Sequence, residues 1–229
     1  MEPLISVIVV TYNRAHFLKD ALDSIKRQTF QDYEIIVVDD GSTDNTKEVA
    51  GKYGGIRYIY QEHGGISKAR NTAIKAAKGK WIATLDSDDL WKEEKLQKQV
   101  DYLRAHPDCR IVYTAFSNFS DIPESKLGEQ QKDLLQTDIN WCLPTALIDA
   151  RLFTEIGLFD ESLVHSEDTD WNFRLKLSNA ADMSHSIDEV LYLRRVHSSN
   201  ISYTHNKICF TDLQKMTIDA YRKVRRLRK

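Results

Sequence analysis

The first 115 residues alternate buried-strand and amphipathic-helix patterns, and this alternation is the feature that most constrains the fold. Residues 5–10, ISVIVV, form an apolar, mostly β-branched run that is typical of a strand buried on both faces. Apolar side chains then recur at helical spacing from Phe17 to Ile25. Further strands are expected at 35–38, 56–60, 81–85 and 110–116, and further helices after residue 44, at 66–77 and at 93–105. Strands joined by single helices predict a mostly parallel sheet with ligands at the carboxyl ends of its strands.

The pattern changes after about residue 117. Residues 118–136 are polar and contain Pro123 and Gly128, which indicates a surface loop or a weakly ordered insertion. A strand is expected at 144–150, an acidic-capped helix at 166–178, a strand at 190–196 and a basic helix at 206–229. The chain shows no internal repeat and no long linker, so these segments predict one globular unit with two subregions.

The composition excludes several classes of protein. Hydrophobic residues at 41% and charged residues at 29% are ordinary globular values. No apolar run approaches the ~20 residues of a membrane helix, and the start MEPLISVIVV lacks the basic residues of a secretory signal. A net charge of −2 gives no indication of nucleic-acid binding. Three widely spaced cysteines without a CxxC pair predict a reduced, cytoplasmic chain without a zinc site.

The basic residues gather at one end of the chain. Six of the last eight residues are Arg222, Lys223, Arg225, Arg226, Arg228 and Lys229. A basic helix with a narrow apolar seam can lie on an anionic membrane surface, which would place the protein at the inner face of the membrane. A plain solvated helix explains the same pattern equally well.

Polar residues follow three of the expected parallel strands. They are Thr11, Tyr12, Asn13 and Arg14, then Asp39 and Asp40, then Asp86, Ser87, Asp88 and Asp89. Several carboxylates at close quarters repel one another unless they are protonated or bridged by a cation, and Mg²⁺ or Mn²⁺ prefers oxygen ligands together with waters and phosphates. Helix capping explains any one of these aspartates, but it explains the Asp-Ser-Asp-Asp run less well. The sequence has no GxxxxGK[ST] or GxGxxG motif, so a phosphate-bearing ligand would be held through a metal.

Five blocks of the chain resemble the signature blocks of family 2 glycosyltransferases with the GT-A fold. They are residues 6–14 (SVIVVTYNR), 37–44 (VVDDGSTD), 69–71 (ARN), 85–89 (LDSDD) and 165–171 (HSEDTDW), and the resemblance covers about residues 4–204. It implies an α/β fold, a GT-A type α/β/α sandwich whose mostly parallel central sheet has a Rossmann-like nucleotide-binding half. The implied domain is 1–205, with a nucleotide-sugar-binding half at 1–117 and an acceptor-binding half at 118–205, followed by the helix at 206–229.

The resemblance also implies a role for each matching residue. The nucleotide-sugar-binding residues would be Thr11, Tyr12, Asn13, Arg14, Asp40, Arg70, Asp86 and Ser87. Tyr12 would lie against a uracil ring, Asp40 would accept the imide N–H of that base, and Asp86 would approach the ribose. Asp88 would ligate Mn²⁺ or Mg²⁺, with His197 as the second protein ligand.

The acidic segment near residue 168 would supply the catalytic base. Asp168 is the implied base, with Glu167 beside it, although a helix-start role favoured by the macrodipole explains the same acids. Asp170 lies ~200° around the helix from Asp168 and is expected to pair with Arg174 at i+4. The family often has a glycine before the acidic pair, and Ser166 in its place leaves the backbone path there open.

The implied activity is an inverting, metal-assisted single displacement from a UDP-sugar to an acceptor nucleophile. The acceptor could be a glycan, a lipid-linked glycan, a peptide or a small molecule. A non-catalytic sugar-nucleotide or glycan binding module would use the same binding residues. A phosphoacceptor receiver domain also carries aspartates at strand ends, but it would need a Lys-Pro step, which this chain lacks.

Overall fold

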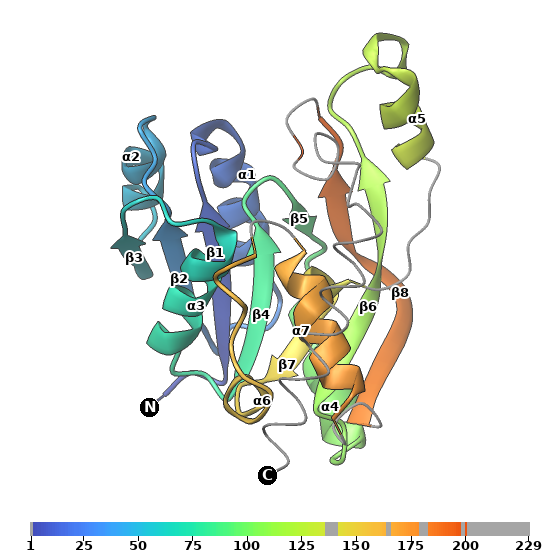
Figure 1. Cartoon of the computed structure of the whole chain (residues 1–229). Helices are drawn as coiled ribbons and strands as arrows, with labels where there is room; N and C mark the ends of the chain where they lie inside the picture. Colours follow the sequence, from blue (N-terminus) through green and yellow to red (C-terminus); the bar gives the residue numbers. More distant parts are fainter. Residues whose placement is uncertain (1, 136–141, 164–165, 179–182, 198–199, 201–229) are drawn as a thin grey trace.

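A computed structural model describes residues 2–135, 142–163, 166–178, 183–197 and 200 (Figure 1). In these residues one eight-stranded sheet has the order β3-β2-β1-β4-β7-β6-β8-β5. The strands are β1 (Ile5–Thr11), β2 (Tyr33–Asp39), β3 (Ile56–Tyr60), β4 (Trp81–Asp86), β5 (Leu90–Trp91), β6 (Ile111–Phe119), β7 (Leu147–Asp149) and β8 (Ser184–Arg195). The helices are α1 (Ala15–Lys26), α2 (Thr46–Gly51), α3 (Ile66–Ala76), α4 (Lys95–Ala105), α5 (Glu129–Leu135), α6 (Leu152–Glu155) and α7 (Glu167–Lys176). Two short 3₁₀ turns are η1 (Glu124–Lys126) and η2 (Leu143–Thr145).

Strand β1 lies in the middle of the parallel part of the sheet. It pairs in parallel with β2 on one side and β4 on the other, and β2 pairs in parallel with β3. The carboxyl ends of β1, β2 and β4 therefore meet at one edge. Strand β7 runs antiparallel between β4 and β6, while β6 and β8 form a second parallel pair. The sheet is thus mostly parallel, as the crossover pattern predicts.

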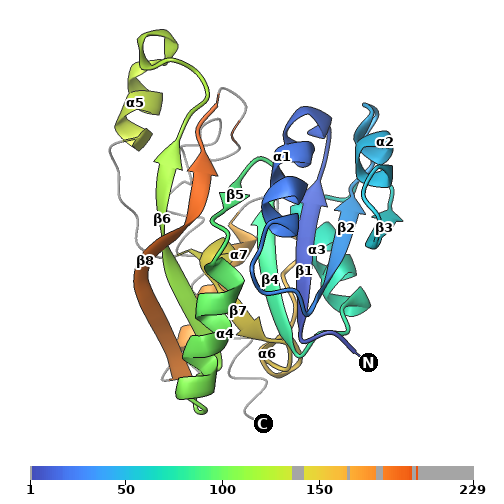
Figure 2. The same cartoon turned by 180° about the vertical axis from the view of Figure 1, so that it is seen from behind.

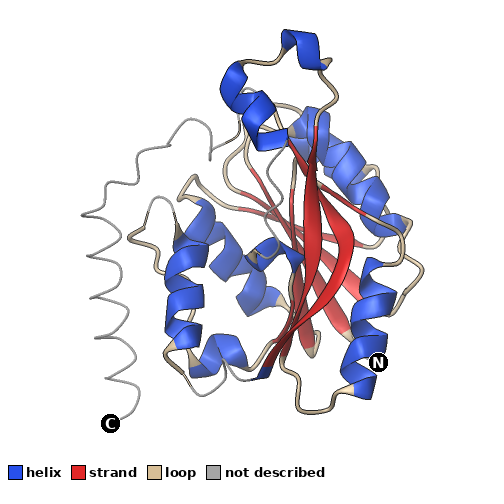
Figure 3. Cartoon of the chain, turned by 90° about the vertical axis from the view of Figure 1, so that its right-hand side faces the viewer, coloured by secondary structure: helices blue, strands red, loops and turns tan. Residues whose placement is uncertain are grey.

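Alternate residues of each central strand pack into two different cores. In β1, Val7 and Val9 pack with the α1, α2 and α4 side, whereas Ile8 packs with the α3, α6 and α7 side. Figure 1 shows the second group of helices in front of the sheet, and Figure 2 shows the first group from behind. Viewed from the side in Figure 3, helices cover both faces of the sheet. Burial on both faces explains the apolar strand sequences and confirms the three-layer prediction.

The structure differs from the sequence prediction mainly in the second half. Part of residues 118–136, expected to be a surface loop, forms η1 and α5, and β6 extends through residue 119. Strand β8 begins at residue 184 instead of 190. Its first residues are half-buried or exposed, so their sequence lacks the apolar pattern that predicts a strand. Strand β5, with only two residues, is too short to predict. The division at residue 117 stays a prediction, and the basic helix at 206–229 lies outside the described residues.

No helix within the described ranges is long and apolar enough to cross a membrane.

Candidate active site

The loop after β1 is tied to the loop after β2 by Asn13. The left-handed backbone at Asn13, with φ of 52°, turns the chain toward α1. The backbone N–H of Asn13 donates to the Ser42 hydroxyl over 2.8 Å, and its side-chain oxygen accepts from the Thr43 N–H over 2.8 Å. The Asp44 carboxylate then accepts from the Ala15 N–H at the start of α1. The side-chain oxygen of Asn13 is therefore used within the protein, and its predicted nucleotide contact remains a prediction.

The predicted nucleobase residues Tyr12 and Asp40 lie beside His63, which was not predicted from the sequence. Tyr12 is 43% exposed, and the His63 ring stacks on it with centroids 4.2 Å apart at an interplanar angle of 20°. Asp40 is buried, and its carboxylate accepts from the N–H groups of Gly64 and Gly65 and from Gln61 Nε2 over 2.7–3.0 Å. His63 Nδ1 lies 2.8 Å from Asp40 Oδ2. In the sequence, an aromatic residue directly before the Gly64-Gly65 pair was the feature that could have pointed to this contact.

Gly41 permits the close approach of the 61–65 segment to the end of β2. Its φ is +86°, and a Cβ at this position would lie 2.8 Å from the backbone nitrogen of His63. Any larger residue would push the segment away from Asp40. The turn of Asp40 and Gly41 thus fixes the position of the His63 backbone.

Thr11 and Ser87 are buried at the ends of their strands. No described residue hydrogen-bonds to the Thr11 hydroxyl, which is enclosed in the protein. Both side chains lie at the edge where binding was predicted, and their contact with a nucleotide sugar stays a prediction.

Arg70 joins the end of β4 to the start of α7. Its Nη2 donates to Asp86 Oδ1 over 3.0 Å, and its Nη1 donates to Glu167 Oε1. The Arg70 and Glu167 side chains are only 5% and 6% exposed. Burial raises the pKa of Glu167, although the charge of Arg70 acts in the opposite direction. The guanidinium therefore brings the distal acidic segment to the edge where β4 ends.

Asp88 and His197 form the predicted metal-ligand pair. His197 Nε2 lies 3.0 Å from Asp88 Oδ2, and Arg14 Nε lies 3.9 Å from the same oxygen. Burial acts to raise the pKa of Asp88, but the hydrogen bond and charge of His197 and the charge of Arg14 lower it below its ordinary value. Within the described part of the chain, no group of three or more His, Cys, Asp or Glu side chains could hold a metal.

Asp89, Tyr192 and Arg195 form a buried polar platform beside this pair, and their mutual contacts were not predicted from the sequence. The Tyr192 hydroxyl donates to Asp89 Oδ2 over 2.6 Å, and the Arg195 N–H donates to Asp89 Oδ1 over 2.7 Å. Arg195 Nε also donates to the Asp88 carbonyl over 2.9 Å, and its guanidinium lies 5.0 Å from the ring centroid of Phe17 and 4.9 Å from that of Phe119. Burial raises the pKa of Asp89 well above its ordinary value. In the sequence, the position of Arg195 two residues before His197 was the feature that could have pointed to this platform.

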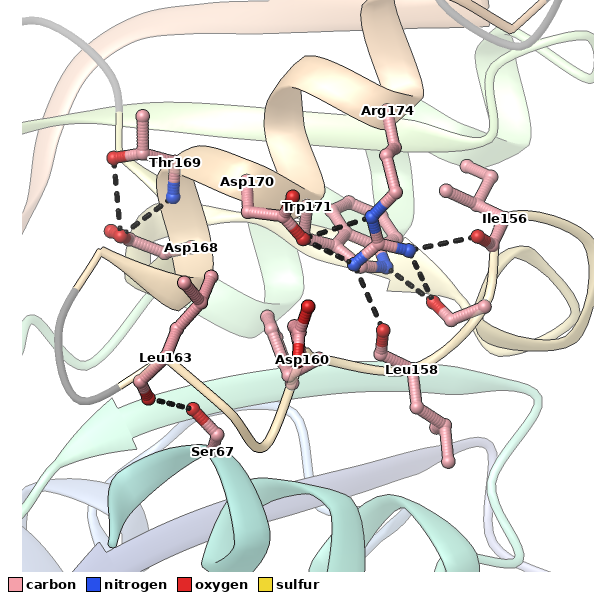
Figure 4. Close-up of polar contacts among 12 residues, drawn as sticks. Ser67, Ile156, Leu158, Asp160, Leu163, Asp168, Thr169, Asp170, Trp171 and Arg174 are labelled. Atoms are coloured by element: carbon pink, nitrogen blue, oxygen red, sulfur yellow. Dashed lines mark hydrogen bonds and ion pairs between the residues drawn. The ribbon is translucent and has the colours of Figure 1, made fainter. Parts of the chain in front are cut away.

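Helix α7 is fixed by Arg174, as Figure 4 shows. Arg174 pairs with Asp170 over 2.9 Å, as the i+4 spacing predicts, and it donates to the carbonyls of Ile156 and Leu158. The Trp171 indole donates to the Gly157 carbonyl over 2.9 Å. These contacts hold the buried face of α7 against residues 156–158, and they leave its first turn directed toward the edge of the sheet.

Asp168 lies in that first turn and is half-buried. Its Oδ1 accepts from the N–H of Thr169 over 2.7 Å, and no other described residue hydrogen-bonds to its carboxylate (Figure 4). Ser166 precedes α7 in a left-handed conformation with φ of 64°. Glycine adopts this conformation readily, which explains why it suits this position. Ser166 follows the same backbone path, the point that its replacement of glycine leaves open in the sequence.

Comparisons with known proteins place the chain in a family. The model of the family described as glycosyl transferase family 2 matches residues 6–157. A protein of Rickettsia prowazekii (strain Madrid E) described as an uncharacterized glycosyltransferase is 36% identical over 219 residues, which cover 89% of this chain and 67% of that protein. EpsJ of Bacillus subtilis (strain 168), with the same description, is 34% identical over 221 residues, covering 88% of this chain and 64% of EpsJ.

Among solved structures, TarS 1–349 of S. aureus in complex with UDP is similar to this chain with a TM-score of 0.69. The two are 25% identical, and the match covers 86% of this chain and 61% of TarS 1–349. The chain spans about two thirds of the length of these relatives. The likeness confirms the predicted GT-A type fold.

Proposed function

The chain belongs to glycosyl transferase family 2, and on that basis we propose that this glycosyltransferase moves a sugar from a UDP-sugar to an acceptor nucleophile with inversion. The observation that carries the proposal is the contact of Arg70 with both Asp86 and Glu167. It brings the acidic segment of the second half to the strand end at which the donor is expected. A donor and a base at one edge are what a single displacement requires.

The donor would lie across the carboxyl ends of β1, β2 and β4. Tyr12 offers an exposed ring for a nucleobase, and Asp40 a carboxylate for its N–H group. Asp86 has a 35% exposed side chain that can meet a ribose, with Arg70 holding its other side. The UDP in the related TarS structure supports uridine as the nucleoside of the donor.

Asp88 and His197 would hold Mn²⁺ or Mg²⁺. Two protein ligands fit these ions, because both ions commonly complete their coordination with waters and phosphate oxygens. Bound there, the cation would supply charge neutralisation for the departing diphosphate. Arg14, 3.9 Å from Asp88, adds a fixed positive charge to the same place.

Asp168 is the proposed base, and Glu167 is a positioning residue. Glu167 is buried against Arg70, so its carboxylate is already engaged. Asp168 is more open, and among the described residues its carboxylate hydrogen-bonds only to Thr169. The Asp168 carboxylate would take the proton of the acceptor nucleophile as that atom attacks the sugar carbon and the bond to UDP breaks.

The proposed acceptor is a glycan, a lipid-linked glycan, a peptide or a small molecule. Membrane contact through residues 222–229 is also part of the proposal.

The test of the donor is a panel of UDP- and GDP-sugars with Mn²⁺, read as the shift of the thermal unfolding midpoint. Stabilisation by UDP-sugars and not by GDP-sugars is the expected result. Stabilisation by GDP-sugars alone would overturn the uridine assignment.

A further inference from the structure

We propose that the His63 side chain is an internal occupant of the nucleobase subsite, which the base of the donor must displace. The proposal rests on the proposed function, because it takes Tyr12 and Asp40 as the nucleobase residues. The His63 ring makes with Tyr12 and Asp40 the same two contacts that the proposed function gives to uracil. One is a stack and the other is the close approach of a ring nitrogen to the Asp40 carboxylate.

The stack is close and nearly parallel. The centroids of the Tyr12 and His63 rings are 4.2 Å apart and their planes differ by 20°. A nucleobase stacks on an aromatic side chain through the same kind of face-to-face contact. The face of Tyr12 that His63 covers is therefore closed to a base while the imidazole stays there.

The hydrogen bond fixes which nitrogen of His63 carries a proton. Nδ1 lies 2.8 Å from Oδ2 of Asp40 and 3.0 Å from the Asp40 carbonyl oxygen. Both neighbours are acceptors, so Nδ1 must be the donor. The N–H group of a planar ring thus donates to the Asp40 carbonyl, while its nitrogen lies 2.8 Å from the carboxylate oxygen that the imide of uracil would reach.

The Asp40 carboxylate has no room for a further donor. Oδ1 accepts from Gly64 N and Gln61 Nε2, Oδ2 accepts from Gly65 N, and His63 Nδ1 lies 2.8 Å from Oδ2. These four nitrogens occupy the positions from which donors reach the lone pairs of the two oxygens. A nucleobase N–H can reach Asp40 only if one of these donors leaves.

His63 is the donor that leaves at least cost. The glycine donors are backbone groups, and the Gln61 side chain is also held by the Thr72 hydroxyl over 2.7 Å. The His63 side chain is 56% exposed and can rotate into solvent while its backbone stays against Gly41. Its departure opens access to Oδ2 of Asp40 and frees one face of Tyr12 together. The apparent dissociation constant of UDP is then raised by the reciprocal of the fraction of molecules in which the imidazole has left.

The test is calorimetric titration of UDP with Mn²⁺ into the wild-type protein, His63→Ala and His63→Phe. Removing the occupant should tighten UDP binding by at least about 3-fold in His63→Ala, the size expected for one lost aromatic pair. His63→Phe keeps the ring and loses the N–H group, so its affinity should lie between the other two. Pyrophosphate with Mn²⁺ carries no base and should bind all three proteins equally.

His106→Ala is the matched control, because His106 is exposed and stacks on Tyr102 with centroids 4.0 Å apart. It should bind UDP like the wild-type protein. Equal or weaker UDP binding by His63→Ala, with its unfolding midpoint unchanged, would overturn the inference and leave the proposed function in place. If UDP binds none of the proteins, the uridine assignment fails and the inference fails with it.

Discussion

The imidazole Nε2 of His197 lies 3.0 Å from the carboxylate Oδ2 of Asp88, although 109 positions of sequence separate the two residues. The Asp89, Tyr192 and Arg195 platform holds both residues, because Arg195 donates to the carbonyl of Asp88 and lies two residues before His197 in the chain. A pair held in this way, in the turn after β4 and just beyond the end of β8, is preorganised for a ligand that both side chains share.

Asp88→Asn tests whether that ligand is a divalent cation. The substitution removes a ligand charge and keeps the size of the side chain. We expect wild-type protein to bind UDP at least about tenfold more tightly with Mn²⁺ than with chelator, a difference of about 1.4 kcal/mol. Asp88→Asn should lose most of that difference in calorimetric titration. The exposed Asp108→Asn should behave as wild type. Equal wild-type affinity with and without metal would contradict the metal assignment.

Asp168→Asn separates the base from the donor site. The amide keeps the size and packing of the side chain but cannot accept a proton at neutral pH. We expect transfer to fall at least ~10²-fold, the lower end of a general-base contribution. Affinity for the UDP-sugar should change less than ~5-fold, about 1 kcal/mol. Calorimetry and product formation on one preparation measure both, with the exposed Asp188→Asn as the control. Transfer that survives within a few-fold would mean that Asp168 is only a helix-start residue.

Arg70→Ala should destabilise the fold as well as the site. It leaves the Glu167 carboxylate buried without its cation, which typically costs about 3–5 kcal/mol. Urea unfolding at neutral pH measures the free energy of unfolding. Arg104→Ala removes an exposed arginine that pairs with Asp101 over 3.0 Å, and its cost should stay below about 1 kcal/mol. Similar small losses for both variants would show that Glu167 does not depend on Arg70.

Lys95 makes stability depend on pH between neutral and alkaline conditions. The side chain is fully buried, donates to Gln99 Oε1 over 2.8 Å and lies over the Trp91 ring. Burial lowers the pKa of Lys95 to about 7. Between that value and the unfolded pKa of about 10.4, the unfolded chain binds one more proton than the folded protein, so the free energy of unfolding rises with pH by up to about 1.4 kcal/mol per unit.

Lys95→Met removes this titration and keeps most of the side-chain volume. The free energy of unfolding of the variant minus that of the wild type should therefore fall by about 1 kcal/mol per pH unit as pH rises from 7 to 9. Urea unfolding of both proteins at each pH gives the difference, in which all other titrating groups cancel. A difference that does not change with pH would show that Lys95 keeps its proton in the folded protein.

The sequence predicts well those elements that are buried on both faces. Residues 5–10 and 35–38 pack into two cores at once, so their apolar runs carry the signal for β1 and β2 directly. Strand β8 is recognisable only in its second half, because the first half is held by pairing with β6 and not by burial. Pairing between strands far apart in the chain leaves little trace in local composition.

The same distinction separates the predicted site residues from the missed ones. Asp86 and Asp88 stand out because an acidic run ends a buried strand. His63 was missed because its contacts with Tyr12 and Asp40 arise only when the segments after β1, β2 and β3 come together. The sequence pointed to Arg70, but its partner Glu167 lies 97 positions away, which no local pattern reveals.

The placement of β7 between β4 and β6 has a consequence for synthesis on the ribosome. Residues 81–83 of β4 pair on one side with β1 but on the other with residues 147–149, which are translated much later. Until then, a nascent chain that ends near residue 117 presents an apolar strand with unpaired backbone groups, a surface that other chains can join. A chain truncated at residue 117 would keep that open edge permanently, so it should aggregate instead of folding as an independent unit.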